Sequence, residues 1–383
     1  MRIKDGNYTI NMPVTTDDDY ALFNVSRELK PEADGFQTIN LRGNPNAYEW
    51  WYFDVLCDDG SVITGTLSAY SNNGFVTHPN SSDGFVLFTH EVNGTTRNEK
   101  ISIPFGDFTA ATDRLNVQTG VVTMTGDFES MSINGEVNGI KLDLTFEQLA
   151  RPYRPGNGYT IIGSGSLSEW RGWINAFPKA TATGTITLDG GEPQIINGIG
   201  YHDHNYGSIT SGQSTDGWLW ARIDTGRYVG VTAQEKYRQK YDGSIINKLL
   251  WVYDTEAKMD ILESIDGKGL TITEGICLPH PDPIHGGGYP TQTVYQYWLN
   301  DDKLVVIFND TGVIDGAINY DIHDPVTQQF LTDNDTNGLY YTRRSSNISL
   351  NFDMQSLNVK DSAEGNALHE LQESYFPQHT ADK

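Results

Sequence analysis

Apolar and polar residues alternate with a period of two along most of the chain. Residues 139–149 place isoleucine, leucine and phenylalanine side chains at every second position, so that they share one face, as a half-buried strand requires. Long helical patterns are scarce. Similar strand-like stretches occur at residues 61–70, 182–190, 217–224, 227–237, 293–299, 303–310 and 347–354.

Turn signals separate these stretches. Asp-Gly and Asn-Gly pairs favour the tight turns of β-hairpins. Such pairs are Asp59-Gly60, Asn93-Gly94, Asn134-Gly135, Asp189-Gly190, Asp242-Gly243 and Asp266-Gly267. Strands recurring every ~8–12 residues indicate barrels or sandwiches. We therefore predict an all-β protein.

A small polar stretch at residues 207–217 is the best candidate for a domain boundary. We predict a lead-in segment over residues 1–30, an N-terminal β-domain over 31–214 and a C-terminal β-domain over 215–383. The Pro- and Gly-rich residues 277–290 predict an ordered surface loop or lid.

Composition narrows the function. Aromatic residues make up 11% of the 383 residues, a high fraction that suits β-sheets and large apolar cavities. The formal net charge is -24, which repels nucleic acid and anionic membranes, so we expect neither as a partner. No stretch approaches the ~20 consecutive apolar residues of a membrane span. The expected partner is a hydrophobic small molecule.

Localisation is left between two alternatives. The first twenty residues lack an apolar signal-peptide core, which fits a cytoplasmic protein or a secreted one in mature form. Glycosylation sequons, slightly more than chance gives, favour the secretory pathway and a glycoprotein; they begin at Asn7, Asn24, Asn80, Asn93, Asn309, Asn334 and Asn347. Cys57 and Cys277 fit one disulfide or two buried thiols.

The run EWWYFD, residues 49–54, is the first candidate for chemistry. In a strand, Trp50 and Tyr52 point one way and Trp51 and Phe53 the other. A strand that is aromatic on both faces is buried on both. It either fills space at the centre of a sheet or provides an aromatic wall for an apolar, unsaturated ligand.

The densest polar cluster is GIGYHDHNYGSI, residues 198–209. Strand alternation gives it two polar faces: Tyr201, Asp203 and Asn205 on one, and His202, His204 and Tyr206 on the other. The two histidines at i and i+2 could share a metal, but no third ligand is signalled, so we expect no metal.

Two further interpretations of this cluster stay open. Asp203 among aromatic residues could deliver a proton, with His202 and His204 orienting it or relaying protons. Alternatively, the residues form a buried polar network that pins the strand and performs no chemistry.

Tryptophans flank the cluster in two segments, residues 169–178 and 217–224. Trp173, Trp218 and Trp220 are candidates for the wall of a shared pocket, or else ordinary core residues. Arg171 and Arg222 fit carboxylate or carbonyl binding as well as surface ion pairs. Serine-hydrolase, phosphate-loop and dinucleotide signals are missing, so we expect no cofactor.

The two motifs EWWYFD and GIGYHDHNYGS, about 150 residues apart, together resemble the carotenoid 1,2-hydratase (hydroxyneurosporene synthase) superfamily. That superfamily includes AttH-like proteins and the lipocalin-like Diels–Alderases of natural-product pathways. The resemblance implies two lipocalin-like β-domains, as β-barrels or β-sandwiches, with the ligand site at their junction.

The resemblance also implies residue roles. In the hydratases the Asp of the Tyr-x-Asp-His segment is the proton donor to an isolated C=C bond, a role that would fall on Asp203 after Tyr201. The hydratases also use a His and a Trp about thirty residues upstream. Trp173 can stand for the Trp, but that segment has no His, which weighs against alkene hydration.

The pericyclase branch demands less, because positioning a flexible substrate supplies most of the rate, up to ~7–11 kcal/mol. We therefore predict a cofactor-free cyclase, similar to a Diels–Alderase, for a hydrophobic polyene or terpenoid–polyketide intermediate of secondary metabolism. The predicted wall is Trp50, Tyr52, Tyr201, Trp173, Trp218 and Trp220, with polar activation by His202, Asp203 and His204. The alternatives are a carotenoid- or terpene-hydratase-like lyase and a non-catalytic lipid- or pigment-binding protein.

Overall fold

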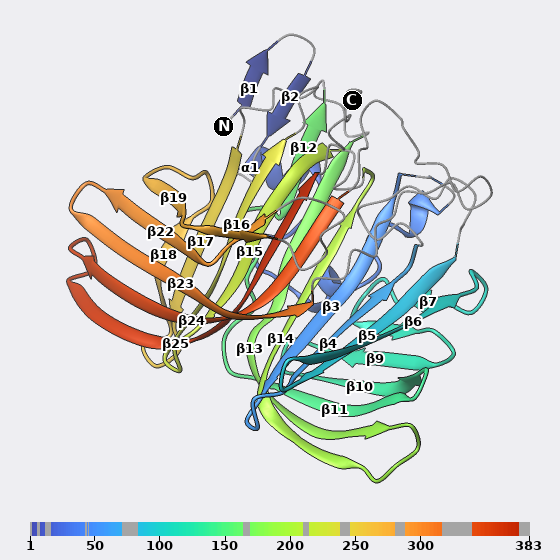
Figure 1. Ribbon diagram of the computed structural model, residues 1–383. Helices are drawn as coiled ribbons and strands as arrows, with labels where there is room; N and C mark the ends of the chain where they lie inside the picture. The colour runs from blue at the N-terminus through green and yellow to red at the C-terminus, as the bar shows by residue number, and fades with distance from the viewer. Residues whose placement is uncertain are drawn as a thin grey trace, which may run out of the picture. The chain divides into compact units, whose positions relative to one another are not determined.

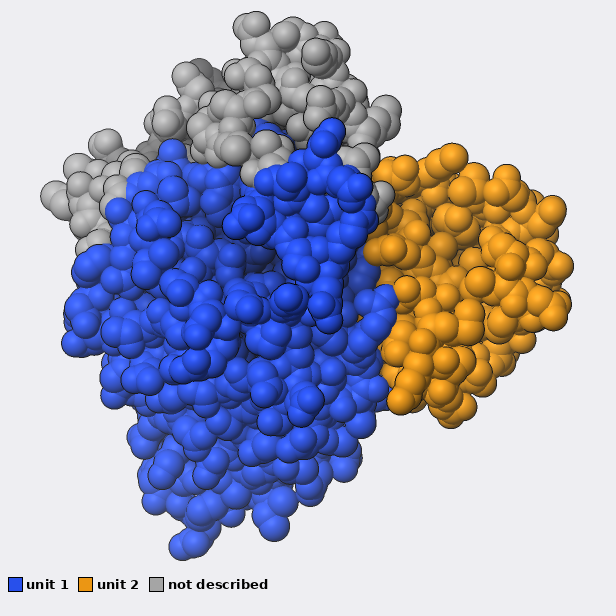
Figure 2. Space-filling view, turned by 180° about the vertical axis from the view of Figure 1, so that it is seen from behind, with its two compact units in different colours: residues 1–210 blue, residues 211–383 orange. Residues whose placement is uncertain are grey.

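The computed structural model describes residues 2–5, 8–11, 17–42, 44, 46–70, 83–163, 169–209, 214–237, 246–279, 288–315 and 339–374. The chain divides into two compact units, residues 1–210 and 211–383 (Figure 2). The sequons at Asn7, Asn80 and Asn334, the Asp242-Gly243 pair, and residues 210–213 and 280–287 of the two predicted loops lie outside the described residues.

Unit 1 is built almost entirely of antiparallel strands (Figure 1). Its strands are β1 (Arg2–Asp5), β2 (Tyr8–Asn11), β3 (Tyr48–Cys57), β4 (Val62–Ser68), β5 (Gly84–Val92), β6 (Thr95–Ile103), β7 (Thr109–Ala110), β8 (Asn116–Gln118), β9 (Val122–Gly126), β10 (Ser130–Val137), β11 (Ile140–Gln148), β12 (Tyr159–Gly163), β13 (Trp170–Leu188) and β14 (Gln194–Gly207). Its helical segments are α1 (Asp17–Leu22), η1 (Pro31–Asp34) and η2 (Ile39–Leu41).

The main sheet of unit 1 runs in the order β6-β5-β4-β3-β14-β13-β11-β10-β9-β8-β7 and forms a half-barrel. β1 and β2 form a hairpin that joins this sheet through β12. The order places β3 and β13, which are far apart in the sequence, on either side of β14. The two sequence motifs therefore meet at the centre of one sheet.

The core of unit 1 is formed by buried apolar side chains contributed by strands along this sheet. Trp51 and Phe53 of β3 belong to it and are fully buried, and β11 alternates buried and exposed residues from Ile140 onward as predicted. Burying a ring of this size stabilises the fold by about 1.5–3 kcal/mol. Cys57 at the end of β3 is a buried thiol, and burial raises its pKa to about 11.

Hairpin turns occur at three of the predicted Gly pairs, Asp59-Gly60, Asn93-Gly94 and Asp189-Gly190. Asp266-Gly267 lies between β18 (Met259–Ser264) and β19 (Leu270–Glu274), which stand at opposite ends of one sheet and do not form a hairpin, so the prediction there was wrong. Asn134-Gly135, predicted as a turn, lies inside β10, and the turn to β11 falls at Asn138-Gly139. Asn138 and Gly139 both have positive φ, 45° and 85°, as a tight hairpin turn needs. Gly135 has a φ of 153°, which a glycine adopts without strain, so the strand continues through it. The prediction at Asn134-Gly135 was wrong because a second Asn-Gly pair, Asn138-Gly139, lies four residues further along and forms the turn instead.

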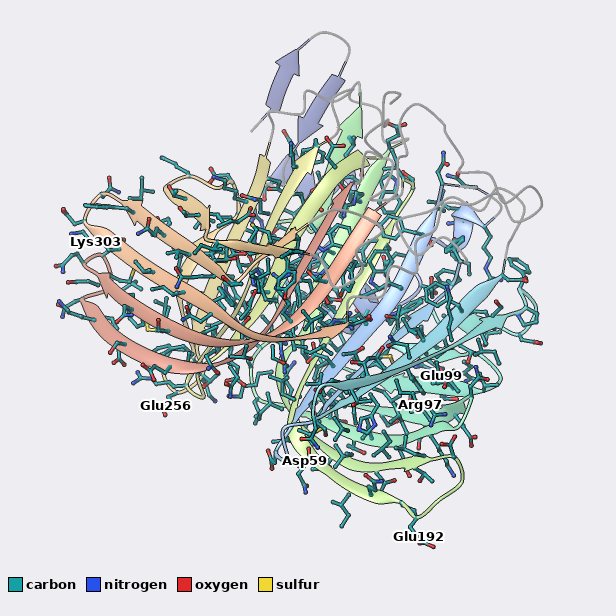
Figure 3. All side chains as sticks on the ribbon, viewed as in Figure 1. Asp59, Arg97, Glu99, Glu192, Glu256 and Lys303 are labelled. Carbon is teal, nitrogen blue, oxygen red and sulfur yellow. The ribbon has the colours of Figure 1, made fainter. Side chains whose placement is uncertain are left out.

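Arg97 of β6 ties an edge of the half-barrel to two turns. Its guanidinium donates to both carboxylate oxygens of Asp189, at 2.8 and 2.9 Å, and to the Asn138 carbonyl at 2.8 Å. Arg97 also pairs with Glu99 on the same strand at 3.0 Å (Figure 3). These contacts join β6 to the β10–β11 and β13–β14 turns.

Unit 2 is a nearly closed barrel, so the all-β prediction is confirmed for both units. Its described strands are β15 (Thr215–Asp224), β16 (Tyr228–Tyr237), β17 (Ile246–Asp254), β18 (Met259–Ser264), β19 (Leu270–Glu274), β20 (Cys277–Pro279), β21 (Gly288–Pro290), β22 (Gln292–Leu299), β23 (Asp302–Asp315), β24 (Leu339–Met354) and β25 (Val359–Ser374). The barrel order is β18-β17-β16-β15-β25-β24-β23-β22-β19, and β20 pairs with β21 separately. Within the described part of the chain, no helix has the length and apolar character to cross a membrane.

Candidate functional site

β14 pairs with β3 in an unbroken register, so its residues alternate cleanly between two faces. Asp203 lies opposite Tyr52 of β3 and opposite Asn175 of β13. Directly paired residues share a face of the sheet, which puts these three side chains together. His202 and His204 fall on the other face, as the alternation predicted. We call the first the Asp203 face and the second the histidine face.

Asp203 is the centre of the first face. Its Oδ2 accepts hydrogen bonds from the Tyr201 hydroxyl at 2.9 Å and the Trp173 indole N–H at 3.0 Å, and its Oδ1 accepts one from the Asn205 amide at 2.9 Å. The side chain is almost fully buried. Each of these contacts brings a donor, which suits the carboxylate, a group that offers only acceptors. The arrangement fixes the carboxylate and two aromatic rings around it.

A second acid–phenol pair lies beside the first. The Tyr52 hydroxyl donates to the buried Asp54 carboxylate at 3.1 Å, and the rings of Tyr52 and Tyr201 are 6.3 Å apart between centroids. Burial, and after it the charge of Asp203, raise the pKa of Tyr201 far above its usual range. Tyr201 is therefore a neutral hydrogen-bond donor at every physiological pH.

Asn175 is a polar residue of this face that the sequence-based prediction missed. Its side chain is fully buried, yet neither amide atom has a hydrogen-bond partner among the described residues. Burying such a group unpaired costs about 1–3 kcal/mol. Its backbone is fixed on both sides, by the pairing with β14 and by two 2.8 Å hydrogen bonds to Tyr153. The sequence feature that could have identified Asn175 is its position as a polar residue within the apolar run WINAF, residues 173–177.

The histidine face carries a buried cluster of two histidines and two acids. His202 Nε2 lies 3.0 Å from Asp34 Oδ2, and His204 Nε2 lies 2.8 Å from Glu49 Oε1. All four side chains are at most 2% exposed. The His204 ring also stacks on Trp51, with centroids 4.5 Å apart. Asp34 lies in η1, outside both sequence motifs, and gave no signal in the sequence.

His202 lies between two acceptors, because its Nδ1 is 2.7 Å from the Tyr52 carbonyl oxygen. Both hydrogen bonds form together when both ring nitrogens carry a proton. Burial by itself lowers the pKa of His202, but the Asp34 carboxylate and the Tyr52 carbonyl outweigh it and raise the pKa above its usual value. The two acceptors at its ring nitrogens and the raised pKa both favour the imidazolium form of His202.

Glu49 extends the cluster to the segment that follows η1. Its carboxylate accepts hydrogen bonds from the Gln37 N–H at 2.7 Å, the Thr38 N–H at 2.7 Å and the Thr38 hydroxyl at 2.5 Å. The Trp51 indole donates to the Asp34 carbonyl at 3.0 Å. The histidine face thus fastens residues 34–38 to the sheet.

The predicted aromatic wall is divided between the units. Trp50, partly exposed, is paired with Asn205 on the Asp203 face, and Trp173 reaches Asp203 directly. Trp218 and Trp220 lie on β15 of unit 2, and their membership of the wall stays a prediction. Of the two arginines, Arg171 donates to the Tyr48 hydroxyl at 3.2 Å, and Arg222 is buried in unit 2.

Nowhere in the described ranges do three or more His, Cys, Asp or Glu side chains form a group able to hold a metal ion.

Comparison with known proteins gives a likeness in structure. No protein-family profile matches the chain, and no curated protein matches it in sequence. An AttH-like protein from Nitrosomonas europaea superposes with a TM-score of 0.59 at 13% identity, covering 87% of this chain and 94% of that one. CghA, a Diels–Alderase crystallised with Sch210972, has a TM-score of 0.60 at 13% identity, covering 88% and 90%. Kievitone hydratase from Nectria haematococca has a TM-score of 0.55 at 11% identity, covering 95% and 97%.

These structures confirm the resemblance inferred from the two motifs. At such low identity the likeness shows the fold. The similar structures include a cyclase and a hydratase, and they do not determine which activity this chain has.

Proposed function

We propose that this chain is a cofactor-free cyclase that binds a flexible, apolar polyene with a carbonyl group and closes a ring by a Diels–Alder-like reaction. The observation that carries the proposal is the buried, unpartnered amide of Asn175 directly across from Asp203. The fold shared with CghA supports an enzyme of this kind.

Asn175 supplies what a pericyclic reaction needs from a protein side chain. Its Nδ2 donates a hydrogen bond to the substrate carbonyl. This hydrogen bond withdraws electron density from the adjoining alkene and makes the alkene a better electron acceptor. A preorganised donor of this kind lowers the activation barrier by about 2.7–4 kcal/mol. The donor is ready because no acceptor in the described part of the chain competes for it.

Asp203 has a positioning role in this proposal. It holds the Tyr201 hydroxyl and the Trp173 indole at fixed places, and these rings with Trp50 and Tyr52 form the surface that folds the polyene. Holding two reacting ends in place supplies up to ~7–11 kcal/mol. His202 and His204 support the sheet from the opposite face.

Hydration is the second candidate, and the Trp173–Asp203 hydrogen bond favours it. The resemblance to carotenoid hydratases implies a Trp near the proton-donating Asp, and this pair lies at 3.0 Å. Against it, the three donors around Asp203 leave its carboxylate without an evident proton to give.

The test uses a synthetic linear triene that carries an enone, incubated with the purified chain and analysed by chiral chromatography with mass detection. We expect an isomeric ring product with one stereoisomer enriched over the uncatalysed reaction. Asn175→Leu removes the donor but breaks no hydrogen bond, so the rate falls about a hundredfold without loss of stability. Asn197→Leu, an exposed change on β14, is the matched control.

Asp203→Asn separates the candidates. A cyclase loses a modest part of its rate, because an amide still holds part of the network. A product heavier by one water that disappears in Asp203→Asn would overturn the proposal in favour of hydration. Binding of the triene without turnover would overturn it in favour of a carrier.

A further inference from the structure

The geometry points to a second binding site, inside the barrel of unit 2, that takes the carboxyl group of an apolar acid between Arg344 and His369. This site belongs to a different unit from the Asp203 face, and it stands whether or not the proposed cyclase activity does.

Arg344 and His369 are direct cross-strand partners on β24 and β25, so their side chains share the inner face of the barrel. Both are fully buried. Further along the same inner face, Ile348, Leu350 and Phe352 form the apolar core of the unit. The pair thus lies on the same inner face as the apolar core of the unit.

Asp310 of β23 compensates the charge of this pair. It accepts a hydrogen bond from Arg344 Nε at 2.6 Å, and its Oδ1 lies 3.3 Å from His369 Nδ1. Thr342 accepts from Arg344 Nη1 at 2.5 Å. Among the described residues, the buried Arg344 Nη2 and His369 Nε2 have no hydrogen-bond partner, and neither has the hydroxyl of Thr293 on β22.

The two unpartnered nitrogens have opposite character. Arg344 Nη2 can only donate. Burial lowers the pKa of His369, so the ring is neutral, and with its Nδ1–H turned to Asp310 its Nε2 is an acceptor. A protonated carboxyl group matches both, because its carbonyl oxygen accepts from Arg344 while its hydroxyl donates to His369. A simple alcohol has a single oxygen for both contacts, whereas a carboxyl group brings a separate oxygen to each nitrogen.

The surroundings of the pair favour an apolar tail on the ligand. Leu371, two residues beyond His369 on the same face, packs with Leu219 in a small buried cluster that Ile272 and Tyr289 extend. The guanidinium of Arg344 lies over the Tyr289 ring, 5.5 Å from its centroid. A medium-chain fatty acid combines the carboxyl head with a tail that these residues can cover.

The experiment measures binding of decanoic acid and of decanol to the full chain by calorimetry. We expect one decanoic acid bound per chain, with decanol much weaker. Arg344→Lys keeps the charge opposite Asp310 but loses the free N–H of the guanidinium, so affinity falls about tenfold or more. Arg343→Lys is the matched control, because Arg343 points to the other face and pairs with Glu370 at 2.7 Å.

Thr293→Val guards against a folding artefact. Thr293 is the cross-strand partner of Phe308, whose ring lies 5.1 Å from the His369 ring, so its hydroxyl lies on the same inner face as the site. Removing this hydroxyl, which has no partner among the described residues, leaves the protein folded, and decanoic acid binding weakens severalfold. Absence of decanoic acid binding to the folded wild-type chain would overturn the inference. So would binding that survives Arg344→Lys and Thr293→Val but is lost in Asp203→Asn, since that would place the acid on unit 1.

Discussion

Glu49→Gln is the sharpest test of the buried cluster on the histidine face. The wild-type carboxylate accepts four hydrogen bonds, from two backbone N–H groups, the Thr38 hydroxyl and His204. Glutamine keeps one acceptor oxygen and turns an NH2 group toward donors on the other side. The substitution also leaves Asp34 as the one remaining acid of the cluster beside His202 and His204, at a site that is buried from water.

The expected loss follows from these contacts. Hydrogen bonds to a charged group contribute about 1.5–3 kcal/mol each. Each carboxylate oxygen of Glu49 accepts two of them, so replacing either oxygen by an NH2 group loses two, and we expect the free energy of unfolding of unit 1 to fall by about 3–6 kcal/mol. With a urea dependence of about 1–3 kcal/mol/M, the midpoint drops by about 1 M or more.

Urea unfolding followed by tryptophan fluorescence measures the midpoint, and hydrogen exchange measures the protection of residues 34–38. Both should fall together, because Glu49 binds the N–H groups of Gln37 and Thr38 directly. Glu136→Gln, the same chemical change at an exposed site on β10, should alter neither. A Glu49→Gln midpoint equal to that of wild type, with residues 34–38 still protected, would refute the account of this face.

Two further predictions concern stability. Because the pKa of His202 is raised in the folded state, its pairing with Asp34 stabilises the fold fully below about pH 6.5 and is lost as the pH rises through the folded pKa. Urea midpoints measured across this range should show that the advantage of wild type over His202→Gln shrinks with rising pH, and a constant difference would contradict the raised pKa. Gly200→Ala should cost about 1–3 kcal/mol, because a Cβ there would lie 2.2 Å from a ring atom of the buried Phe146. Thermal unfolding measures this cost against Gly106→Ala, where nothing lies within 4 Å, and equal melting temperatures for the two variants would disprove it.

The fold could be predicted from the sequence because strand period and turn chemistry are local properties. Residues 139–149 alternate in sequence and in burial, and most Gly pairs fall where the chain turns. The failure at Asn134-Gly135 has the same local origin. Asn138-Gly139 offers equal turn chemistry, and only the pairing of β10 with β11 over eight residues decides between them.

Only the part of the candidate site that depends on local strand alternation could be predicted from the sequence. Alternation along residues 201–206 is enough to separate Asp203 from the histidines, and the register of β14 with β3 keeps them apart. Asp34, however, reaches His202 from 168 residues away, and no local pattern marks it as a partner. Asn175 did leave a mark, since an amide inside an apolar strand conflicts with its surroundings, and such conflicts gather at functional sites.

The two faces of β14 limit what substitutions of its histidines can show about function. His202 and His204 hold Asp34 and Glu49, so their loss loosens residues 34–38 and lowers any activity through the fold. Asn175 can be replaced without breaking a hydrogen bond. Activity lost in Asn175→Leu at an unchanged unfolding midpoint would therefore place the chemistry on the Asp203 face. If a histidine variant loses activity and stability together, the result does not show on which face the chemistry takes place, because both faces depend on the same strand.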